Sequence, residues 1–318
     1  MNRKQVLVLG GAGFIGSTIA ETLSIAGYPV TVLDGLLPRT GGNRRNTGRF
    51  GSGVRMIEAR VEEFSALGDL LRDHQIIVDA MGWTAHRLAL RDPAYDLSLN
   101  LAAHIHWASL LPADGRKEVI YLGSRGQYGN PGGGVITEES VQLPEDVQGI
   151  HKMAAEMEIR LFCRLRKCSF VSLRIPNTFG EFQPLAGDDI GLVGGFIRDL
   201  INGQEVEVYG QGRRRTITYS SDLARIIAKL CDRGISGLGA FNIPGHDVVL
   251  EDLLGMLVRL VGTGRFTARA LPDEIRAIDM GNAQFSAEKL ASFLGEIPMT
   301  PLETSLAKTV TYFRSSTP

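Results

Sequence analysis

Three glycines near the start of the chain have the spacing that binds a diphosphate. Gly10, Gly13 and Gly16 follow the apolar run 6–9 and lead into a segment with helical spacing from about 15 to 26. The first glycine permits a tight turn, the second lets the backbone approach the phosphates, and the third lets the helix pack closely on the strand. The open amides and the positive end of the helix would then face the phosphates. The residues predicted to contact a dinucleotide here are Gly10, Gly13, Phe14, Ile15 and Gly16.

An acidic residue ends the next strand-like run. The run 29–33 is apolar, and Asp34 follows it, 18 residues after Gly16. A carboxylate at this distance can accept hydrogen bonds from both hydroxyls of an adenosine ribose, and it repels the 2′-phosphate of NADP. The sequence therefore favours NAD over NADP as the cofactor. Three arginines in the loop after Asp34 would instead favour NADP, namely Arg39, Arg44 and Arg45.

The composition argues against several classes of partner. The 318 residues carry 34 basic and 35 acidic side chains, so no excess of charge favours nucleic acid or an anionic membrane surface. No apolar run approaches the roughly 18 residues that span a bilayer, and no signal peptide is recognisable. The three cysteines lack metal-ligand spacing, and His104 and His106 are two apart on a predicted helix, so they point to different faces. We expect a reducing, cytoplasmic compartment and no bound metal.

Alternating strand and helix patterns must position the glycine loop. Through the first 180 residues, apolar runs alternate with segments of helical period, which is typical of an α/β protein with a doubly wound, Rossmann-like parallel sheet. Strands are predicted at 6–9, 29–33, 54–58, 76–80, 118–122 and 169–175, and the main helices at 15–26, 64–73, 95–111 and 148–166. Because ligands of such sheets lie at the carboxyl ends of the strands, Met81 and Gly82 join the predicted cofactor contacts.

The alternation weakens after residue 180, which we interpret as a change of domain. A dinucleotide-binding domain is predicted over 1–180, to which 216–245 returns. A smaller C-terminal α/β domain for the substrate is predicted from 181–215 and 246–318. Within these parts, Ser221 and Asp222 are expected to cap a helix that runs to about 232. The other predicted elements are helices at 190–201, 250–261 and 286–294 and strands at 205–209 and 241–243.

The order of these motifs resembles the extended short-chain dehydrogenase/reductases, in their nucleotide-sugar epimerase and dehydratase branch. The resemblance covers nearly the whole chain. Besides the glycine loop and Asp34, further segments match motifs of that family. They are 91–93 with Asn100, Ser124 with 128–129, Lys152 with Glu156, 174–180, 208–212 with Arg215, 222–224, 241–243, and 294–295 with Pro298. The resemblance implies that NAD stays bound through the catalytic cycle while a nucleotide-diphosphate sugar lies between the two domains. It also implies a homodimer formed through the helices at 95–111 and 148–166.

The same resemblance implies roles for individual residues. Ser124 would hydrogen-bond the sugar hydroxyl that is oxidised, while Lys152 would bind the nicotinamide ribose and lower the pKa of a neighbouring acid by its charge. Two arginines of the family clamp the diphosphate, as expected from the two-point pairing of a guanidinium with phosphate oxygens. The implied substrate contacts beyond Ser124 are Asn177, Tyr209, Arg215 and Arg276.

The chain departs from the family pattern at several positions. Arg60, before Val61, stands where an acid usually lines the adenine pocket, and it could stack on adenine or face solvent. Asp79 stands where histidine is common, and Gly123 where a serine often precedes Ser124. We expect Arg60 and Val61 to flank the cofactor.

The largest departure concerns the catalytic motif Tyr-x-x-x-Lys, whose two side chains share one helix face. Here the segment 148–152 reads Gln-Gly-Ile-His-Lys, so Gln148 occupies the tyrosine position. A phenolate near Lys152 could take a hydroxyl proton, whereas a glutamine amide does not titrate near pH 7. The sequence therefore predicts an NAD-dependent epimerase or dehydratase that lacks the usual general base.

Three interpretations of Gln148 stay open. In the first, another group carries the proton, and the candidates are His86, His151, Tyr128 or a water held by Ser124 and Gln148. An imidazole titrates near neutrality, but His151 lies about 100° around the helix from Lys152. In the second, the chain binds NAD and a nucleotide sugar without redox chemistry. In the third, Gln148 is a deliberate substitution that traps substrate in an ordinary epimerase.

Overall fold

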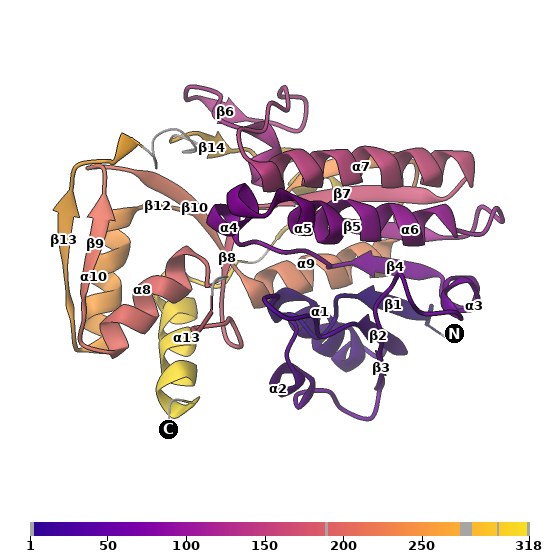
Figure 1. Cartoon of the computed structure of the whole chain (residues 1–318), viewed down its shortest axis with the longest axis horizontal. Helices are drawn as coiled ribbons and strands as arrows, with labels where there is room; N and C mark the ends of the chain where they lie inside the picture. Colours follow the sequence, from indigo (N-terminus) through magenta and orange to yellow (C-terminus); the bar gives the residue numbers. More distant parts are fainter. Residues whose placement is uncertain (1–2, 188–189, 274–281, 298, 317–318) are drawn as a thin grey trace.

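A seven-stranded parallel sheet forms the centre of the computed structural model, which describes residues 3–187, 190–273, 282–297 and 299–316 (Figure 1). The strands, in spatial order, are β11 (Leu238–Asn242), β7 (Ser169–Ile175), β5 (Glu118–Ser124), β4 (Ile76–Asp79), β1 (Val6–Leu9), β2 (Val30–Asp34) and β3 (Val54–Glu58). Every pairing within this sheet is parallel. The predicted doubly wound sheet is therefore confirmed.

The sheet is apolar on both faces because helices cover both. In β1, the side chains of Val6 and Val8 pack into one layer with α1 (Phe14–Ile25) and α9 (Ser220–Arg233). Leu7 and Leu9 point the other way, into a second layer. The helices of this second layer are α3 (Leu67–Asp73), α6 (Ala103–Ser109) and α7 (Val147–Leu165). Burial on both faces explains the continuous apolar runs that predicted these strands.

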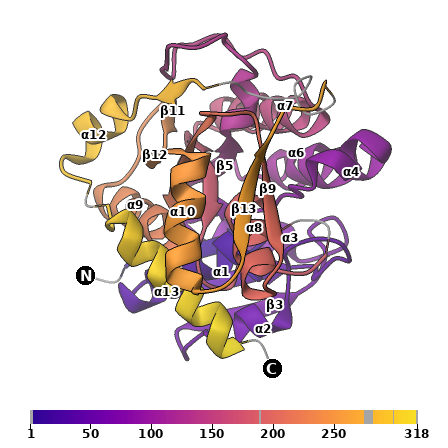
Figure 2. The same cartoon turned by 90° about the vertical axis from the view of Figure 1, so that its left-hand side faces the viewer.

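A smaller group of strands and helices lies beside the carboxyl ends of the large sheet (Figure 2). One sheet has the order β12 (His246–Val249), β10 (Arg214–Tyr219), β8 (Asn177–Phe179), and β9 (Glu205–Tyr209) pairs with β13 (Arg265–Arg269). Three helices, α8 (Leu192–Ile201), α10 (Leu250–Val261) and α13 (Leu302–Ser316), share an apolar core with these strands. This core includes Phe179, Val206 and Leu257, all buried.

The chain passes between the two parts more than twice, because β12, α10, β13 and α13 of the smaller part follow β11. It leaves the large sheet after β7, builds β8, α8, β9 and β10 in the smaller part, and returns with α9 and β11. Helix α9 packs against α1, and β11 pairs with β7. The boundaries predicted for the two domains stay a prediction.

The structure has several further short elements, of which α4 and a 3₁₀ turn contribute residues to the cavity described below. They are α2 (Arg44–Thr47), α4 (His86–Arg91), α5 (Pro93–Leu97), a 3₁₀ turn (Arg125–Tyr128), β6 (Val135–Ile136), β14 (Gln284–Phe285) and α12 (Glu288–Leu294). None of the described helices is both long and apolar enough to span a membrane.

Two predicted helices differ from the structure. The helix expected over 95–111 is divided into α5, a π-helical turn (Ser98–Ala102) and α6. Such turns are frequent at functional sites, and this one carries the buried Asn100. The cap expected from Ser221 and Asp222 is wrong, because α9 begins at Ser220 without a side-chain cap. Asp222 instead accepts hydrogen bonds from the backbone and hydroxyl of Thr300.

Candidate active site

A cavity of about 1200 Å³ opens at the carboxyl ends of the parallel strands and extends to α8 and β9 of the smaller part. Sixteen predicted site residues line it: Gly10, Gly13, Phe14, Ile15, Gly16, Asp34, Arg60, Val61, Met81, Gly82, His86, Ser124, Gln148, Lys152, Asn177 and Tyr209. Arg215 is buried, is not among the residues that line this cavity, and donates to the Arg214 carbonyl. Arg276 lies outside the described residues.

The glycine loop has the shape that its sequence predicts. Gly10 has a φ of +73°, and a Cβ at this position would lie 2.8 Å from the Met81 amide nitrogen. At Gly16, a Cβ would overlap the carbonyl oxygen of Gly10. The first turn of α1 carries no acidic residue, so nothing there neutralises the positive end of the helix. These features fit the diphosphate of a dinucleotide.

Asp34 joins the end of β2 to the glycine loop. Its Oδ2 accepts a hydrogen bond from the Ala12 amide at 2.9 Å, and its Oδ1 accepts one from the Leu36 amide at 2.8 Å. Burial raises the pKa of the Asp34 carboxyl, and the two amides oppose that shift. Each oxygen retains a second lone pair, so the carboxylate can still accept ribose hydroxyls.

The three arginines in the loop after Asp34 contact residues that do not line the cavity. Arg39 lies over the rings of Trp83 and Tyr95 and pairs with Asp92. Arg44 pairs with Glu58 of β3, and Arg45 lies over the ring of Tyr312. None of the three arginines is among the described residues that line the cavity.

Lys152 lies on α7 beneath the ends of β4 and β5. Its Nζ donates to the carbonyl oxygens of Met81 at 2.9 Å and Leu122 at 3.1 Å. Burial lowers the pKa of Lys152 to about 8, and the carboxylates of Asp79 and Asp96 oppose this shift. At neutral pH the side chain is therefore mainly an ammonium group that donates hydrogen bonds.

Asp79 is a fully buried acid at the end of β4. Its Oδ2 accepts from His104 Nδ1 at 2.6 Å and from Trp107 Nε1 at 2.9 Å, and its Oδ1 accepts from the Met81 amide at 3.1 Å. His104 is fully buried as well. The acid thus holds the backbone that leads to Gly82 and contributes negative charge beneath Lys152.

Gln148 binds the backbone of the loop after β4. It is 3% exposed, and its Nε2 donates to the Trp83 carbonyl oxygen at 2.6 Å. The same oxygen accepts from Asn100 Nδ2, while Asn100 Oδ1 accepts from the Trp83 amide. Asp96 accepts a bond from Asn100 and binds His151 Nδ1 at 2.6 Å. Gln148 therefore positions this loop, and His151 is directed at Asp96 rather than lining the cavity.

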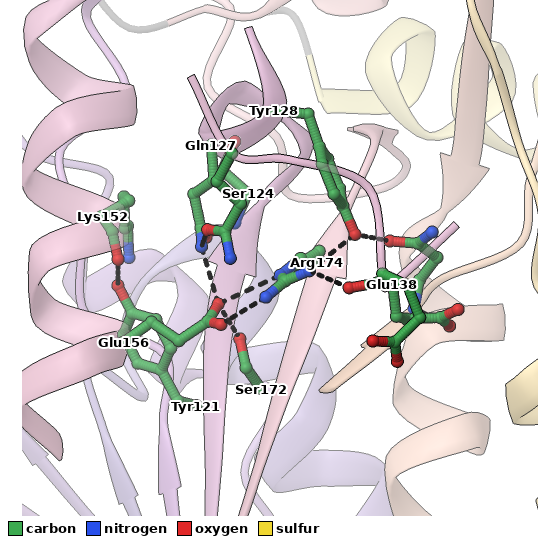
Figure 3. Close-up of polar contacts among 12 residues, drawn as sticks. Tyr121, Ser124, Gln127, Tyr128, Glu138, Lys152, Glu156, Ser172 and Arg174 are labelled. Atoms are coloured by element: carbon green, nitrogen blue, oxygen red, sulfur yellow. Dashed lines mark hydrogen bonds and ion pairs between the residues drawn. The ribbon is translucent and has the colours of Figure 1, made fainter. Parts of the chain in front are cut away.

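Ser124 caps the 3₁₀ turn that follows β5 (Figure 3). Its Oγ accepts from the Gly126 amide at 3.0 Å, and its own amide donates to Gln127 Oε1 at 2.7 Å. Gln127 in turn donates to Glu156 Oε2 at 2.6 Å. A hydroxyl that accepts one bond still has its own proton to donate, so Ser124 can bind a ligand in the cavity.

A buried ion pair supports the far side of this turn (Figure 3). Arg174 Nη2 donates to Glu156 Oε1 at 2.6 Å, and Ser172 Oγ donates to Glu156 Oε2 at 2.6 Å. Arg174 Nη1 also donates to the Tyr128 hydroxyl, which itself donates to Asn242 Oδ1. Burial raises the pKa of Tyr128, although Arg174 opposes the shift. Tyr128 thus belongs to the interior network and not to the cavity wall.

His86, at the start of α4, binds a carboxylate at the start of α7. Its Nδ1 lies 2.6 Å from Asp146 Oδ2, across 60 residues of sequence. The other oxygen of Asp146 accepts from the Gly149 amide at 2.6 Å and caps α7. Burial acts to raise the pKa of Asp146, but His86 and the Gly149 amide lower it overall. Asp146 is not among the residues predicted for the site, and its one local signal in the sequence is an acid placed before a helix.

Comparisons with known proteins agree with this arrangement. Residues 6–243 match the model of the NAD dependent epimerase/dehydratase family. The UDP-glucuronic acid decarboxylase 1 of Xenopus tropicalis is 27% identical over 330 residues, with 98% of this chain and 73% of that protein covered. The UDP-glucose 4-epimerase of Mycolicibacterium smegmatis is 24% identical over 324 residues, with 98% and 99% covered.

A solved structure has the same fold over the full length of the chain. It is the UDP-N-acetylglucosamine 4-epimerase of Methanobrevibacter ruminantium in complex with UDP-N-acetylmuramic acid. The TM-score is 0.86 at 21% sequence identity, and both chains are covered completely. From the family match over 6–243, the chain belongs to the NAD dependent epimerase/dehydratase family.

Proposed function

We propose that this protein is an NAD-dependent epimerase or dehydratase that transiently oxidises the sugar of a nucleotide-diphosphate sugar. One observation supports this most directly: a single cavity joins the glycine loop and Asp34 to Ser124 and Lys152. The same cavity reaches Asn177 and Tyr209 of the smaller part. We further propose that 1–180 with 216–245 holds the cofactor and that 181–215 with 246–318 holds the substrate.

The cofactor contacts follow from the elements that line the cavity. The diphosphate would lie on the amides at the start of α1, and Asp34 would accept the adenosine ribose hydroxyls. Lys152 would donate to the nicotinamide ribose, and Met81 and Gly82 would border the nicotinamide. Arg60 and Val61 would flank the adenine. When bound, NAD supplies the hydride acceptor of the reaction.

The proposed substrate contacts lie at the other end of the cavity. The hydroxyl of Ser124 would donate to the sugar oxygen that becomes a carbonyl. Asn177 and Tyr209 would contact the nucleotide, and Arg215 and Arg276 stay predicted ligands of the diphosphate. The names of the relatives include UDP-sugars, which supports a nucleotide-diphosphate sugar as the substrate class.

We propose a homodimer in which α6 and α7 of two copies pack together. These two helices lie side by side on one face of the large sheet (Figure 1). Large apolar side chains on these helices, or directly after them, face outward: Leu110, Met157, Leu161 and Leu165 are 44, 57, 38 and 64% exposed. Light scattering should give about twice the mass of 34.5 kDa, and Leu161→Glu should give the monomer mass. A monomeric wild-type chain would contradict this proposal.

The three cysteines are free and buried, which supports the expectation of a reducing, cytoplasmic compartment.

Proton NMR in deuterated water tests the proposed function. The protein is incubated with NAD and UDP-, dTDP-, GDP- and CDP-sugars in turn. An epimer would identify an epimerase, whereas a 4-keto product with deuterium in the sugar would identify a dehydratase. Line broadening of one sugar without any product would indicate binding without redox chemistry, and no broadening with any sugar would reject the proposal.

A further inference from the structure

Building on the proposed function, we propose that His86, oriented by Asp146, exchanges the proton of the reacting sugar hydroxyl. This pair would act in place of the tyrosine that the family motif leads one to expect at position 148.

Two hydrogen bonds bring the loop after β4 onto the first turn of α7. Gln148 donates to the Trp83 carbonyl oxygen, and three residues further along His86 binds Asp146. Asp146 caps α7, and Gln148 is in the first turn of that helix. His86 and Gln148 line the same cavity as Ser124. The imidazole is therefore held within one helical turn of the place where a phenol would have been expected.

In this pair, His86 can act as a base and Asp146 fixes the orientation of its ring. An ionised Asp146 requires a proton on His86 Nδ1, which leaves the lone pair on Nε2. The Asp146 side chain is 15% exposed and also bonded to the Gly149 amide, so it keeps its orientation. The His86 side chain is 48% exposed, so an imidazolium can exchange its proton with water. The carboxylate stabilises that imidazolium as it forms.

The reaction balances without another reactant. The hydroxyl proton moves from the sugar oxygen to His86 Nε2, while the hydride of the same carbon goes to NAD, so a carbinol becomes a ketone. On reduction, Nε2 returns the proton to the oxygen.

The other titratable groups around the cavity are less suited to this role. Tyr128 is in the interior network, and His151 binds Asp96 away from the cavity. Lys152 is already a donor to two backbone oxygens. Arg87 and Arg91 of α4 line the cavity together with His86, as do Arg125 and Lys152. The other charged residues that line it are Asp34, Arg60, Glu62, Arg198, Asp199, Glu205 and Glu207. Helix α5, packed against α4, contributes Asp96, which binds His151 and Asn100, and Asp92, just before α5, is paired with Arg39. Among the described residues, Asp146 is the acid that contacts the imidazole.

Three variants of the full-length protein test the pair. His86→Gln removes the base and should lower kcat at least 100-fold with little change in KM. Asp146→Asn keeps a good helix cap but loses the charge, and kcat should fall about 10-fold. His151→Gln is the matched control, because His151 also binds a carboxylate through Nδ1 at 2.6 Å but does not line the cavity, and it should keep more than half of kcat.

A measurement without cofactor or substrate adds an independent readout. In ¹⁵N NMR of the unliganded protein, His86 should carry its proton on Nδ1 when neutral. Asp146→Asn should weaken this preference for Nδ1, because an amide can donate a hydrogen bond to the ring as well as accept one. A wild-type kcat in His86→Gln, or a neutral His86 imidazole protonated on Nε2 in the wild-type protein, would overturn the inference.

The failure of this inference is distinguishable from that of the proposed function. Binding of NAD and a nucleotide sugar by the wild-type protein, without product or deuterium exchange, overturns the role of His86 and leaves the binding site standing. Absence of binding of either ligand overturns the proposed function as well.

Discussion

Glu156 of α7 and Arg174 of β7 form a buried two-point ion pair, with nitrogen–oxygen distances of 2.6 and 3.2 Å. Glu156 also accepts from Gln127, which binds the Ser124 amide, and Arg174 donates to Tyr128. One ion pair therefore supports both ends of the turn that presents Ser124 to the cavity.

Removing one partner of this pair should destabilise the protein strongly. Glu156→Ala leaves the Arg174 guanidinium uncompensated in the interior, and we expect the free energy of unfolding to fall by about 3–5 kcal/mol. Urea unfolding followed by circular dichroism measures the change. The matched control is Arg44→Ala, because Arg44 and Glu58 have the same 2.6 Å separation while their side chains are 76 and 43% exposed. A loss below about 1 kcal/mol is expected there, and equal losses in the two variants would contradict the prediction.

Gln148→Tyr should separate the three interpretations of position 148. If His86 carries the proton, tyrosine adds no needed base and removes the bond to the Trp83 carbonyl oxygen, so kcat should stay the same or fall. If the chain is a binding protein or a trapped epimerase, tyrosine four residues before Lys152 should raise turnover. NMR assay of product formation decides, and a tenfold gain would reject the first interpretation.

Asp34→Asn should weaken the preference for NAD over NADP. The carboxylate repels a 2′-phosphate and accepts from ribose hydroxyls, and an amide does neither as well. We expect the ratio of the two dissociation constants to fall at least about tenfold, equivalent to about 1.4 kcal/mol, as measured by calorimetry. Glu58→Gln is the control, because Glu58 pairs with Asp34 in the sheet register but does not line the cavity. A ratio unchanged by Asp34→Asn would remove Asp34 from the cofactor site.

Lys152 should give stability a distinctive dependence on pH. Burial lowers its pKa to about 8 from 10.5, so between these values the unfolded chain binds more protons than the folded chain. The free energy of unfolding should therefore rise with pH across this interval, by on the order of 3 kcal/mol from this group. The difference between wild type and Lys152→Met, measured by urea unfolding from pH 7 to 10.5, isolates the effect. A difference that is flat or declines with pH would contradict it.

The fold was predictable because its strands are apolar runs buried on two faces. The strands at 54–58 and 205–209 and the helix at 250–261 have the predicted bounds. Most residues predicted from the family motifs line one cavity, because the spacing of the motifs places these residues at the ends of strands. The short pairing of β6 with β14 was not predictable, because each strand has only two residues and the partners are far apart in the sequence, with Val135 beside Gln284.

The side-chain contacts within the site could not be predicted from the sequence. The π-helical turn interrupts a segment whose apolar spacing reads as one continuous helix, and it directs Asn100 to Trp83. The pairing of His86 with Asp146 joins two elements that no periodicity relates. Sequence patterns report which face of an element is buried, whereas these contacts depend on how separate elements meet.

The return of the chain through α9 and β11 bears on how this protein could have diversified. The large sheet gains β11 only after β8, α8, β9 and β10 of the smaller part have been made, and β12, α10, β13 and α13 of that part follow β11. No single cut in the sequence therefore separates the part proposed to bind the cofactor from the part proposed to bind the substrate. Recombination at one crossover would leave the sheet without its last strand. New sugar specificities in such an architecture are therefore expected to arise by point substitution and loop change within an intact chain, and not by exchange of a terminal module.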